Sequence, residues 1–242
     1  MMNLSGKTAL ITGSTQGIGY AIAKAFCAAG ARVFVHCSSD AEKAEKIRAE
    51  LGAYGAVTAD LSKIEETKML AAKTGELDIL VLNASVQYRT AWDEITEEEF
   101  DCQINVNLKS TLLLMQAYIP AMQKKGFGRV ITIGSVQQSK PHAQMAVYAA
   151  TKTAVVNLVK NVAKQVAGDG VTVNNIAPGV IATPRNEAAL SDAAYAKKVL
   201  DGIPMGVAGD AADLAGAALL LASDEGRYTT GVDLYVDGGM SL

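Results

Sequence analysis

Short apolar segments alternate with segments of helical periodicity along the chain, and this alternation restricts the possible fold more than any other feature. Strands are expected at residues 7–12, 31–36, 56–59, 77–82, 129–134, 171–176 and 231–236. Apolar strands that are separated by helices form a parallel sheet with helices on both faces. The sequence therefore predicts an α/β fold with a doubly wound parallel sheet.

Two capping-box patterns mark the expected starts of helices. Ser62 with Glu65 precedes one helix, and Thr96 with Glu99 opens a long helical region that ends near Gly126. In such a box, a hydroxyl group and a carboxylate satisfy free backbone N–H groups in the first turn. We therefore expect helices to begin directly after Ser62 and Thr96.

The composition indicates that residues 1–242 form a single domain. Half of the residues are hydrophobic, and no linker or repeat interrupts the pattern. A net charge of −3 without a basic stripe argues against nucleic acid and anionic membranes as partners, which favours a small molecule. The N-terminus lacks a signal-like leader, and Cys27, Cys37 and Cys102 are odd in number and far apart. We therefore expect a cytoplasmic protein without disulfides or a metal site.

Ser135, Tyr148 and Lys152 have a spacing that suits acid–base catalysis. Ser135 follows an apolar strand, whereas Tyr148 and Lys152 lie four residues apart on one face of a helix. A nearby ammonium group lowers the pKa of a tyrosine from its usual value of about 10. The phenol could then exchange a proton with a carbonyl or alcohol oxygen, to which we expect Ser135 to hydrogen-bond.

An exposed helix pair would give the same spacing as Tyr148 and Lys152, because Tyr-x-x-x-Lys also occurs by chance. The chain contains a second such pair, Tyr20 and Lys24, in the helix after a glycine-rich loop and without a serine thirteen residues before its tyrosine. This context favours the catalytic interpretation for the pair that follows Ser135.

A glycine-rich loop joins the first expected strand to the first expected helix. It consists of Gly13, Ser14, Thr15, Gln16, Gly17, Ile18 and Gly19. Glycines let the backbone turn tightly and approach a pyrophosphate, whose charge is met by the N-terminus of the helix. A generic turn is the alternative, but the position between a strand and a helix favours a dinucleotide site.

The spacing Gly-x-x-x-Gly-x-Gly, together with Ser135, Tyr148 and Lys152, resembles the short-chain dehydrogenase/reductase family over essentially the whole chain. The similarity extends to its 3-oxoacyl-reductase-like and sugar-dehydrogenase-like members. The resemblance implies a single Rossmann-like domain around a sheet of about seven strands, usually assembled as a homotetramer. It also implies that Asn107 is a fourth catalytic residue, which helps to hold a water linked to the lysine. A solvent-facing helix residue is the alternative for Asn107.

The same resemblance implies additional cofactor contacts, among them an adenine-contacting aspartate at Asp60, which could equally be a turn residue. The other residues expected here are Leu61, Asn83, Ala84, Ser85, Pro178, Gly179, Ile181 and Thr183, in addition to Tyr148 and Lys152. The family usually has Asn-Asn-Ala-Gly after the fourth strand, but this chain has Leu-Asn-Ala-Ser at 82–85. Serine adopts a positive φ less readily than glycine, so we expect the turn at Ser85 to differ slightly.

The end of the second expected strand bears on the choice between NAD and NADP. NAD-specific sites generally carry an acidic residue there, which binds the ribose and repels a 2′-phosphate, but this chain has Cys37 at that position. Asp40 is close by and is more simply a helix cap. The sequence therefore favours NADP over NAD, with Ser38, Ser39 and His36 as candidate phosphate ligands.

The substrate is less well defined than the reaction. Many relatives reduce 3-oxoacyl groups on a carrier protein and use two arginines that flank the site to hold this acidic partner. Arg129 matches one of them, but Asp169 takes the place of the second and would repel an acidic carrier.

Polar residues are numerous at the expected rim of the pocket. They are Gln87, Tyr88, Gln137, Gln138, His142, Gln144, Arg185 and Asn186. Loops are polar in general, but these groups favour a hydroxylated substrate such as a sugar acid, keto sugar or polyol. Residues 184–209 are expected to form a lid over it. We expect hydride transfer between a ketone and a secondary alcohol; the alternatives are a 3-oxoacyl thioester (acyl-carrier-protein or CoA) reductase and a non-catalytic cofactor-sensing protein.

Overall fold

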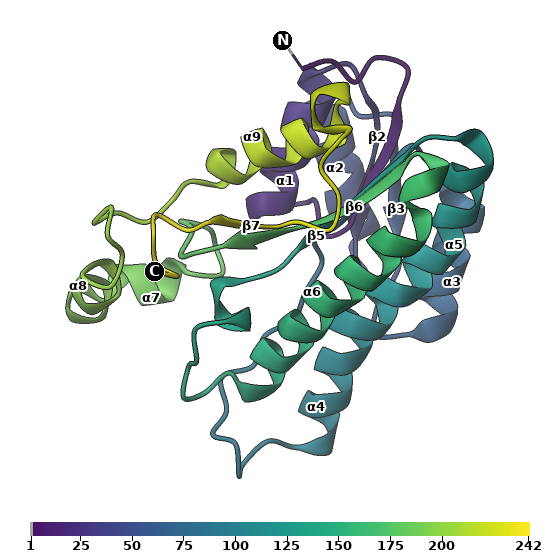
Figure 1. Cartoon of the computed structure of the whole chain (residues 1–242). Coiled ribbons are helices and arrows are strands. Elements are labelled where there is room, and N and C mark those ends of the chain that lie inside the picture. The colour runs from purple at the N-terminus through teal and green to yellow at the C-terminus, as the bar shows by residue number, and fades with distance from the viewer. Residues whose placement is uncertain (1) are drawn as a thin grey trace.

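Seven parallel strands form the centre of the protein in a computed structural model that describes residues 2–242, except for the side chains at positions 188 and 189 (Figure 1). The strands are β1 (Thr8–Ile11), β2 (Arg32–Cys37), β3 (Gly55–Thr58), β4 (Ile79–Leu82), β5 (Gly128–Ile133), β6 (Val171–Pro178) and β7 (Asp233–Val236). Their order across the sheet is β3-β2-β1-β4-β5-β6-β7, and every neighbouring pair is parallel. The predicted doubly wound, Rossmann-like sheet is confirmed.

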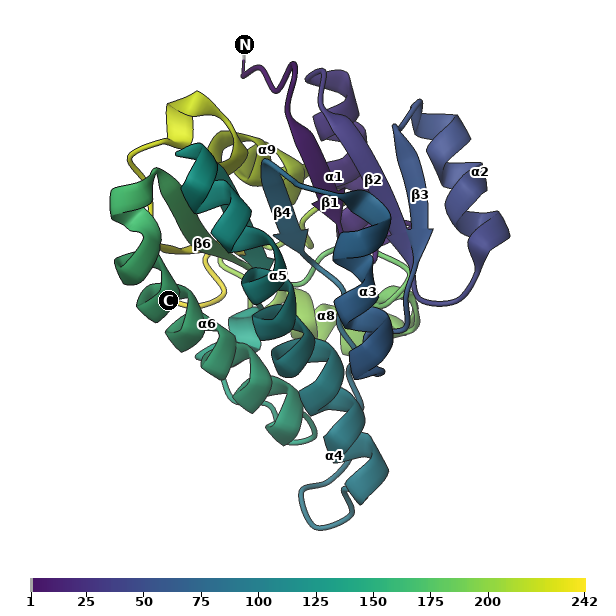
Figure 2. The ribbon, with the colours of Figure 1, turned by 90° about the vertical axis from the view of Figure 1, so that its right-hand side faces the viewer.

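Helices cover both faces of this sheet. They are α1 (Gly17–Ala28), α2 (Ala41–Leu51), α3 (Ile64–Thr74), α4 (Glu97–Gln103), α5 (Ser110–Lys125), α6 (Ala146–Val166), α7 (Glu187–Ser191), α8 (Ala193–Leu200) and α9 (Ala211–Ala222). Figure 2 shows α3, α5 and α6 side by side on one face. The opposite face is covered by α1, α2 and α9, of which α1 and α9 pack against each other.

Alternate residues of each strand point to the two helical layers, which is why the strands are apolar throughout. Leu10 and Leu80 are paired neighbours in the sheet and face the layer of α3, α5 and α6. Ile11 and Val81, one residue further along, face α1 and α9. Since successive side chains of a strand point to opposite faces, the two buried layers require continuous apolar runs.

The chain changes direction across the sheet at β1, whose neighbours are β2 on one side and β4 on the other. In sheets of this kind, the connections leave the carboxyl ends of the two central strands toward opposite faces and leave a crevice between them. The loops after β1 and β4 contain the glycine-rich segment and residues 83–85. Both segments are therefore placed at one crevice.

The capping patterns have different outcomes. Thr96 caps α4 as expected, because its Oγ1 accepts a hydrogen bond from the backbone N–H of Glu99 (3.2 Å). The box at Ser62 is wrong: α3 begins at Ile64 after Lys63, and both the N–H and the hydroxyl of Ser62 donate to Asp60 Oδ1. The described part of the chain has no helix with the length and hydropathy needed to cross a membrane.

Candidate active site

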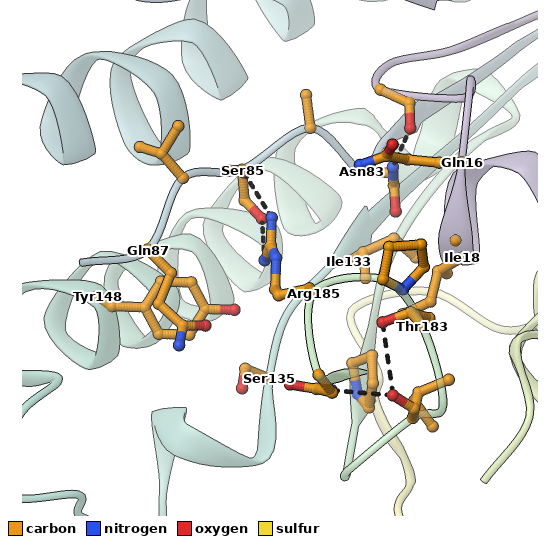
Figure 3. Close-up of a pocket in the computed structure, with 18 of the residues that line it drawn as sticks. Gln16, Ile18, Asn83, Ser85, Gln87, Ile133, Ser135, Tyr148, Thr183 and Arg185 are labelled. Atoms are coloured by element: carbon orange, nitrogen blue, oxygen red, sulfur yellow. Dashed lines mark hydrogen bonds between the residues drawn. The ribbon is translucent and has the colours of Figure 1, made fainter. Parts of the chain in front are cut away.

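A cavity of about 490 Å³ lies at the carboxyl ends of the strands. Most of the predicted site residues line it: Gly13, Thr15, Gln16, Gly17, Ile18, His36, Ser38, Asp60, Leu61, Asn83, Ala84, Ser85, Ser135, Tyr148, Lys152, Pro178, Gly179, Ile181 and Thr183. Figure 3 shows Gln16, Asn83, Ser135 and Tyr148 around the same space, although they come from separate parts of the chain. Ser14, Gly19, Ser39 and Asn107 are not among its lining residues.

The glycine-rich loop has the backbone geometry that a phosphate cradle requires. Gly13 and Gly17 have φ values of 63° and 57°, in the left-handed region that favours glycine. Gly17 is also the first residue of α1, so that free N–H groups and the positive end of the helix dipole are at the cavity. These residues fit the pyrophosphate of a dinucleotide cofactor.

Asn83 connects the loop after β4 to the glycine-rich loop. Its Nδ2 donates to the carbonyl oxygens of Thr12 (2.9 Å) and Gly13 (3.0 Å). A Cβ atom on Gly19 would lie 2.5 Å from both Asn83 Nδ2 and the oxygen of Gly13. Gly19 therefore acts behind the cavity wall, where it leaves room for the amide that holds the two loops together.

His36 is not a phosphate ligand, contrary to the sequence-based expectation. Its side chain is only 1% exposed, and both ring nitrogens have backbone partners. Nδ1 accepts from the N–H of Gly13 (3.0 Å), which leaves Nε2 to donate to the carbonyl of Ala59 (3.0 Å). Burial lowers the pKa of this imidazole to about 4, so the ring is neutral at pH 7. His36 instead supports the glycine-rich loop from behind.

Ser14 also supports this loop and is completely buried. Its Oγ accepts a hydrogen bond from the N–H of His36 (2.9 Å), and its own N–H donates to the carbonyl of His36 (3.0 Å). Both the hydroxyl and the N–H of Ser14 therefore bond to β2, and the residue does not line the cavity, so the structure does not support its predicted contact with a cofactor. Ser39, next to the helix cap Asp40, lies outside the cavity, whereas Ser38 lines it.

Tyr148 and Ser135 approach the cavity from α6 and from the end of β5. Tyr148 is 5% exposed, and burial raises the pKa of its phenol. The positive charge of Arg185 and the hydroxyl of Ser135 act in the opposite direction, because they stabilise the phenolate. Arg185 is thus a charge that acts on Tyr148, a role that sequence reasoning gave to Lys152. Ser135 Oγ itself accepts from the N–H of Gln137 (3.2 Å).

Lys152 lies one helical turn after Tyr148 and is 4% exposed. Its Nζ is 5.6 Å from the centre of the Tyr148 ring and donates to the carbonyl of Ile133 (2.7 Å). Burial lowers the pKa of Lys152 to about 7, and the charge of Arg185 acts in the same direction. By contrast, Tyr20 of the second Tyr-x-x-x-Lys pair bonds to Glu50 on the protein surface.

Asn107 is buried beneath the site and does not face solvent. It lies in a π-helical segment, Ile104–Lys109, between α4 and α5. Its side chain binds both the N–H and the C=O of Val86 (2.9 Å each) and donates to Thr151 Oγ1 (3.2 Å). Thr151 in turn donates to the carbonyl of Tyr148 (2.7 Å), so Asn107 connects the loop after β4 to the helix of the tyrosine.

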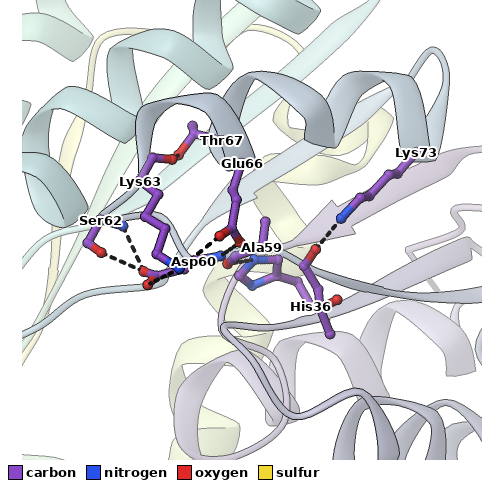
Figure 4. A network of polar contacts seen from close by, with 9 residues as sticks. His36, Ala59, Asp60, Ser62, Lys63, Glu66, Thr67 and Lys73 are labelled. Carbon is purple, nitrogen blue, oxygen red and sulfur yellow. Dashed lines mark hydrogen bonds and ion pairs between the residues drawn. The ribbon is translucent and has the colours of Figure 1, made fainter.

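The far end of the cavity holds Asp60, Ser38 and a residue that sequence reasoning missed, Lys43. Asp60 accepts from the N–H (3.0 Å) and the hydroxyl (2.7 Å) of Ser62, within the polar network of Figure 4. Lys43 Nζ donates to Gln16 Oε1 (3.0 Å) and lines the cavity with Ser38. Its position in the first turn of α2 was the available signal, because helical side chains tilt toward the N-terminus of their helix, and here Lys43 reaches Gln16 of the glycine-rich loop.

Ser85 stands where the family usually has glycine, and its backbone needs no unusual conformation, since only glycines have a positive φ in the described residues. Arg185, just before α7, donates from Nη1 to Ser85 Oγ (2.9 Å) and from Nη2 to Ser85 O (2.7 Å). The departure in the motif therefore provides a hydrogen-bond acceptor for Arg185.

Arg129 does not flank this cavity in the described chain. It lies at the amino end of β5, whereas Ser135 follows the carboxyl end of the same strand, and its side chain is 4% exposed. Its guanidinium donates to the carbonyl of Gly128 (2.9 Å) and stacks on Phe127. Asp169 accepts from Gln123 (2.6 Å) in the same region, so neither residue reaches the cavity.

Comparison with known proteins agrees with this geometry. Residues 13–241 match the family model described as enoyl-(acyl carrier protein) reductase. The chain is 41% identical to the 3-oxoacyl-[acyl-carrier-protein] reductase FabG of Escherichia coli, over the full length of both proteins. It is 38% identical to the 2-dehydro-3-deoxy-D-gluconate 5-dehydrogenase of Bacillus subtilis, which covers 98% of this chain and 95% of the relative.

A similar solved structure is a 3-oxoacyl (acyl-carrier-protein) reductase of Agrobacterium tumefaciens with NADP bound. It is 37% identical, with a TM-score of 0.91 over 98% of this chain and 95% of that chain. The chain therefore belongs to the short-chain dehydrogenase/reductase family. It is an oxidoreductase of this family, so the cofactor-sensing alternative is set aside.

Proposed function

We propose that this protein interconverts a ketone and a secondary alcohol with NADP as its cofactor, on a small hydroxylated substrate such as a keto sugar, sugar acid or polyol. The observation that carries the proposal is the convergence of Ser135, Tyr148 and Lys152 in a cavity that also holds a glycine-rich cradle. Proton transfer to a carbonyl oxygen needs a positioned acid, and hydride transfer to the carbon bonded to that oxygen needs a cofactor held beside it; this cavity is suited to both.

In the direction of reduction, Tyr148 donates its phenolic proton to the carbonyl oxygen, while the Ser135 hydroxyl donates a hydrogen bond to the same oxygen. A bound nicotinamide cofactor supplies the hydride for the carbonyl carbon. Lys152 and Arg185 provide positive charge that stabilises the phenolate left behind. Asn107 holds the helix of Tyr148 in position through Thr151.

The preference for NADP is supported by the end of the cavity near β2. Cys37 stands at the position where an acidic residue would repel a 2′-phosphate, and the cation Lys43 lies near Ser38 and Gln16. A lysine ammonium and a serine hydroxyl are suitable partners for a phosphate. The relative from Agrobacterium tumefaciens was solved with NADP bound.

The hydroxylated substrate class is supported by the polar end of the cavity, which includes Gln87, Gln137 and Asn186. Residues 184–209, with α7 and α8, are proposed to form a lid, because Leu190, Tyr195 and Val199 of these helices line the cavity. The second candidate is a 3-oxoacyl thioester reductase, which the 41% identity to FabG favours.

We also propose that the protein is a cytoplasmic homotetramer. Three large apolar side chains on the arm formed by α4, α5 and the preceding loop, Trp92, Phe100 and Leu112, are exposed. They are suitable for burial between subunits. Light scattering on the purified protein tests the oligomeric state, and a monomer at micromolar concentration would contradict it.

The proposed reaction is tested by the rates of NADPH and NADH oxidation with keto sugar acids, keto sugars, a 3-oxoacyl thioester and simple diketones. We expect turnover with NADPH and a preference for the hydroxylated ketones. A preference for the thioester would favour the second candidate, and a preference for NADH would contradict the cofactor assignment.

A further inference from the structure

Arg185 projects from the lid segment across the cavity toward the loop after β4. Figure 3 shows its guanidinium between Ser85 and the hydroxyl end of Tyr148. Both of its hydrogen bonds to Ser85 go to neutral oxygens. Within the described part of the chain, the guanidinium forms no ion pair, since none of the close acid–base contacts involves it. The positive charge is therefore positioned at the site but is not neutralised by the protein.

The charges around the cavity are unequally distributed. Asp60 is the only acidic residue among the described residues that line it, and it lies at the end near β3. The end near Tyr148 has Arg185, Lys152 and Arg89. Burial lowers the pKa of His142 at this end, and the nearby charge of Arg89 lowers it further. This end of the cavity therefore favours an anionic ligand.

The location of Arg185 relates this charge to the reacting atoms. The guanidinium acts electrostatically on both Tyr148 and Lys152. It is thus close to the place where the carbonyl of a substrate would meet Tyr148. A guanidinium binds a carboxylate through two parallel hydrogen bonds, a geometry that neutral hydroxyl groups do not match.

We propose that Arg185 binds a carboxylate of the substrate, and that the natural substrates are therefore hydroxylated keto acids and the corresponding hydroxy acids. This inference rests on the proposed function and narrows its substrate class from neutral and acidic sugars to the acids. Ser85 is a positioning residue, because its two oxygens hold the guanidinium over the cavity. The glycine that the family usually has at this position would provide only its carbonyl oxygen as an acceptor for Arg185.

A matched pair of substrates tests this assignment. 5-Keto-D-gluconate and L-sorbose have the same ketone and hydroxyl groups and differ only in a carboxylate that is replaced by a hydroxymethyl group. With NADPH, we expect a lower KM for the acid than for the sugar. Arg185→Gln is expected to raise the KM for the acid at least tenfold and that for L-sorbose less than threefold. Arg185→Lys, which keeps the charge without the fork, should lie between them.

A variant outside the cavity separates this effect from the loss of any positive charge. Arg227 is exposed and does not line the cavity, so Arg227→Gln should change neither KM. Equal effects of Arg185→Gln on the two substrates would overturn the assignment and leave the proposed reaction intact. Turnover of a 3-oxoacyl thioester, but of neither 5-keto-D-gluconate nor L-sorbose, would instead contradict the proposed substrate class.

Binding without turnover decides the inference independently of activity. In the NADPH complex of Tyr148→Phe, the Kd for 5-keto-D-gluconate can be measured by calorimetry. We expect that adding Arg185→Gln raises this Kd at least tenfold and that adding Arg227→Gln leaves it unchanged. The absence of any Arg185-dependent binding of the acid would overturn the inference, whatever substrate the activity assay favours.

Discussion

The ammonium group of Lys152 donates a 2.7 Å hydrogen bond to the carbonyl oxygen of Ile133, the last residue of β5. Ser135 follows two residues later, so this bond fixes the lysine to the strand that delivers the serine. The arrangement places a cation where it is almost completely buried. Burial of a charge is unfavourable for stability and is typical of functional sites.

Replacement of Lys152 should therefore stabilise the cofactor-free protein while it abolishes activity. The pKa of Lys152 falls from 10.5 to about 7 on folding. The unfolded chain binds more protons between these values, so wild-type stability rises with pH in this range. We expect the free energy of unfolding of Lys152→Met to exceed that of wild type at pH 6, with the difference shrinking by roughly 3 kcal/mol at pH 9.

Urea unfolding at the two pH values measures this change. Lys160→Met on the exposed side of α6 is the control, and its difference from wild type should not depend on pH. A difference for Lys152→Met that is equal at pH 6 and pH 9 would mean that the buried lysine carries no unfavourable charge.

Lys43→Gln should weaken the binding of NADPH more than that of NADH. Only NADPH has the 2′-phosphate that the ammonium near Ser38 and Gln16 can contact. We expect the Kd for NADPH to rise about tenfold and that for NADH to change less than twofold, as measured by fluorescence titration. Lys46→Gln, on the same helix but away from the cavity, is the matched control. A parallel loss of both cofactors would contradict the phosphate contact.

Gly19→Ala should destabilise the protein and weaken its cofactor binding, because the new Cβ would lie 2.5 Å from the amide of Asn83. Such overpacking typically costs about 1 to 3 kcal/mol. Gly216 in α9 has no atom within 4 Å of a built Cβ, so Gly216→Ala should be stabilising by about 0.5 to 1 kcal/mol. The melting temperatures of the two variants measure these changes. Equal shifts in Tm would show that Gly19 is not confined by Asn83.

His36 should make the protein sensitive to mild acid. Folding lowers its pKa from 6.5 to about 4, so the unfolded state binds more protons between these values and stability falls as the pH decreases through this window. At pH 5 this contribution amounts to roughly 2 kcal/mol relative to pH 7.5. His36→Asn should be less stable at pH 7.5 but lose about 2 kcal/mol less on acidification.

The comparison of His36→Asn with His142→Asn separates this effect from general acid denaturation. His142 is only partly buried and lies at the cavity rim, so its replacement should leave most of the acid sensitivity in place. If both variants lose stability with pH as steeply as wild type, the bond between Gly13 and His36 Nδ1 does not govern the response.

Local sequence patterns were sufficient to predict the sheet and the convergence of Ser135, Tyr148 and Lys152 at one cavity. The apolar strands such as β4 are buried on both faces, and the spacing of Tyr148 and Lys152 puts both side chains on the cavity side of α6. These features depend on residues close together in the chain, where periodicity is informative. The helix cap at Asp40 was recognised for the same reason.

Contacts between distant segments were not predictable in this way. The role of His36 depends on Gly13 and Ala59, and that of Arg185 depends on Ser85, one hundred residues earlier. The sequence pattern around Ser62 predicts a helix cap, but in the fold both the N–H and the hydroxyl of Ser62 donate to the carboxylate of Asp60 instead. The hydrogen-bond partners of these side chains are determined by tertiary contacts that form only in the folded protein.

The most direct test of the proposed reaction is the turnover of Tyr148→Phe with NADPH and a keto sugar acid. The variant keeps the ring of Tyr148 but has no proton to donate, so we expect kcat to fall at least 1,000-fold while the Kd for NADPH changes less than threefold. Tyr20→Phe in the surface pair is the control and should retain full activity. A Tyr148→Phe enzyme with kcat within tenfold of wild type would contradict the assignment of Tyr148 as the proton donor.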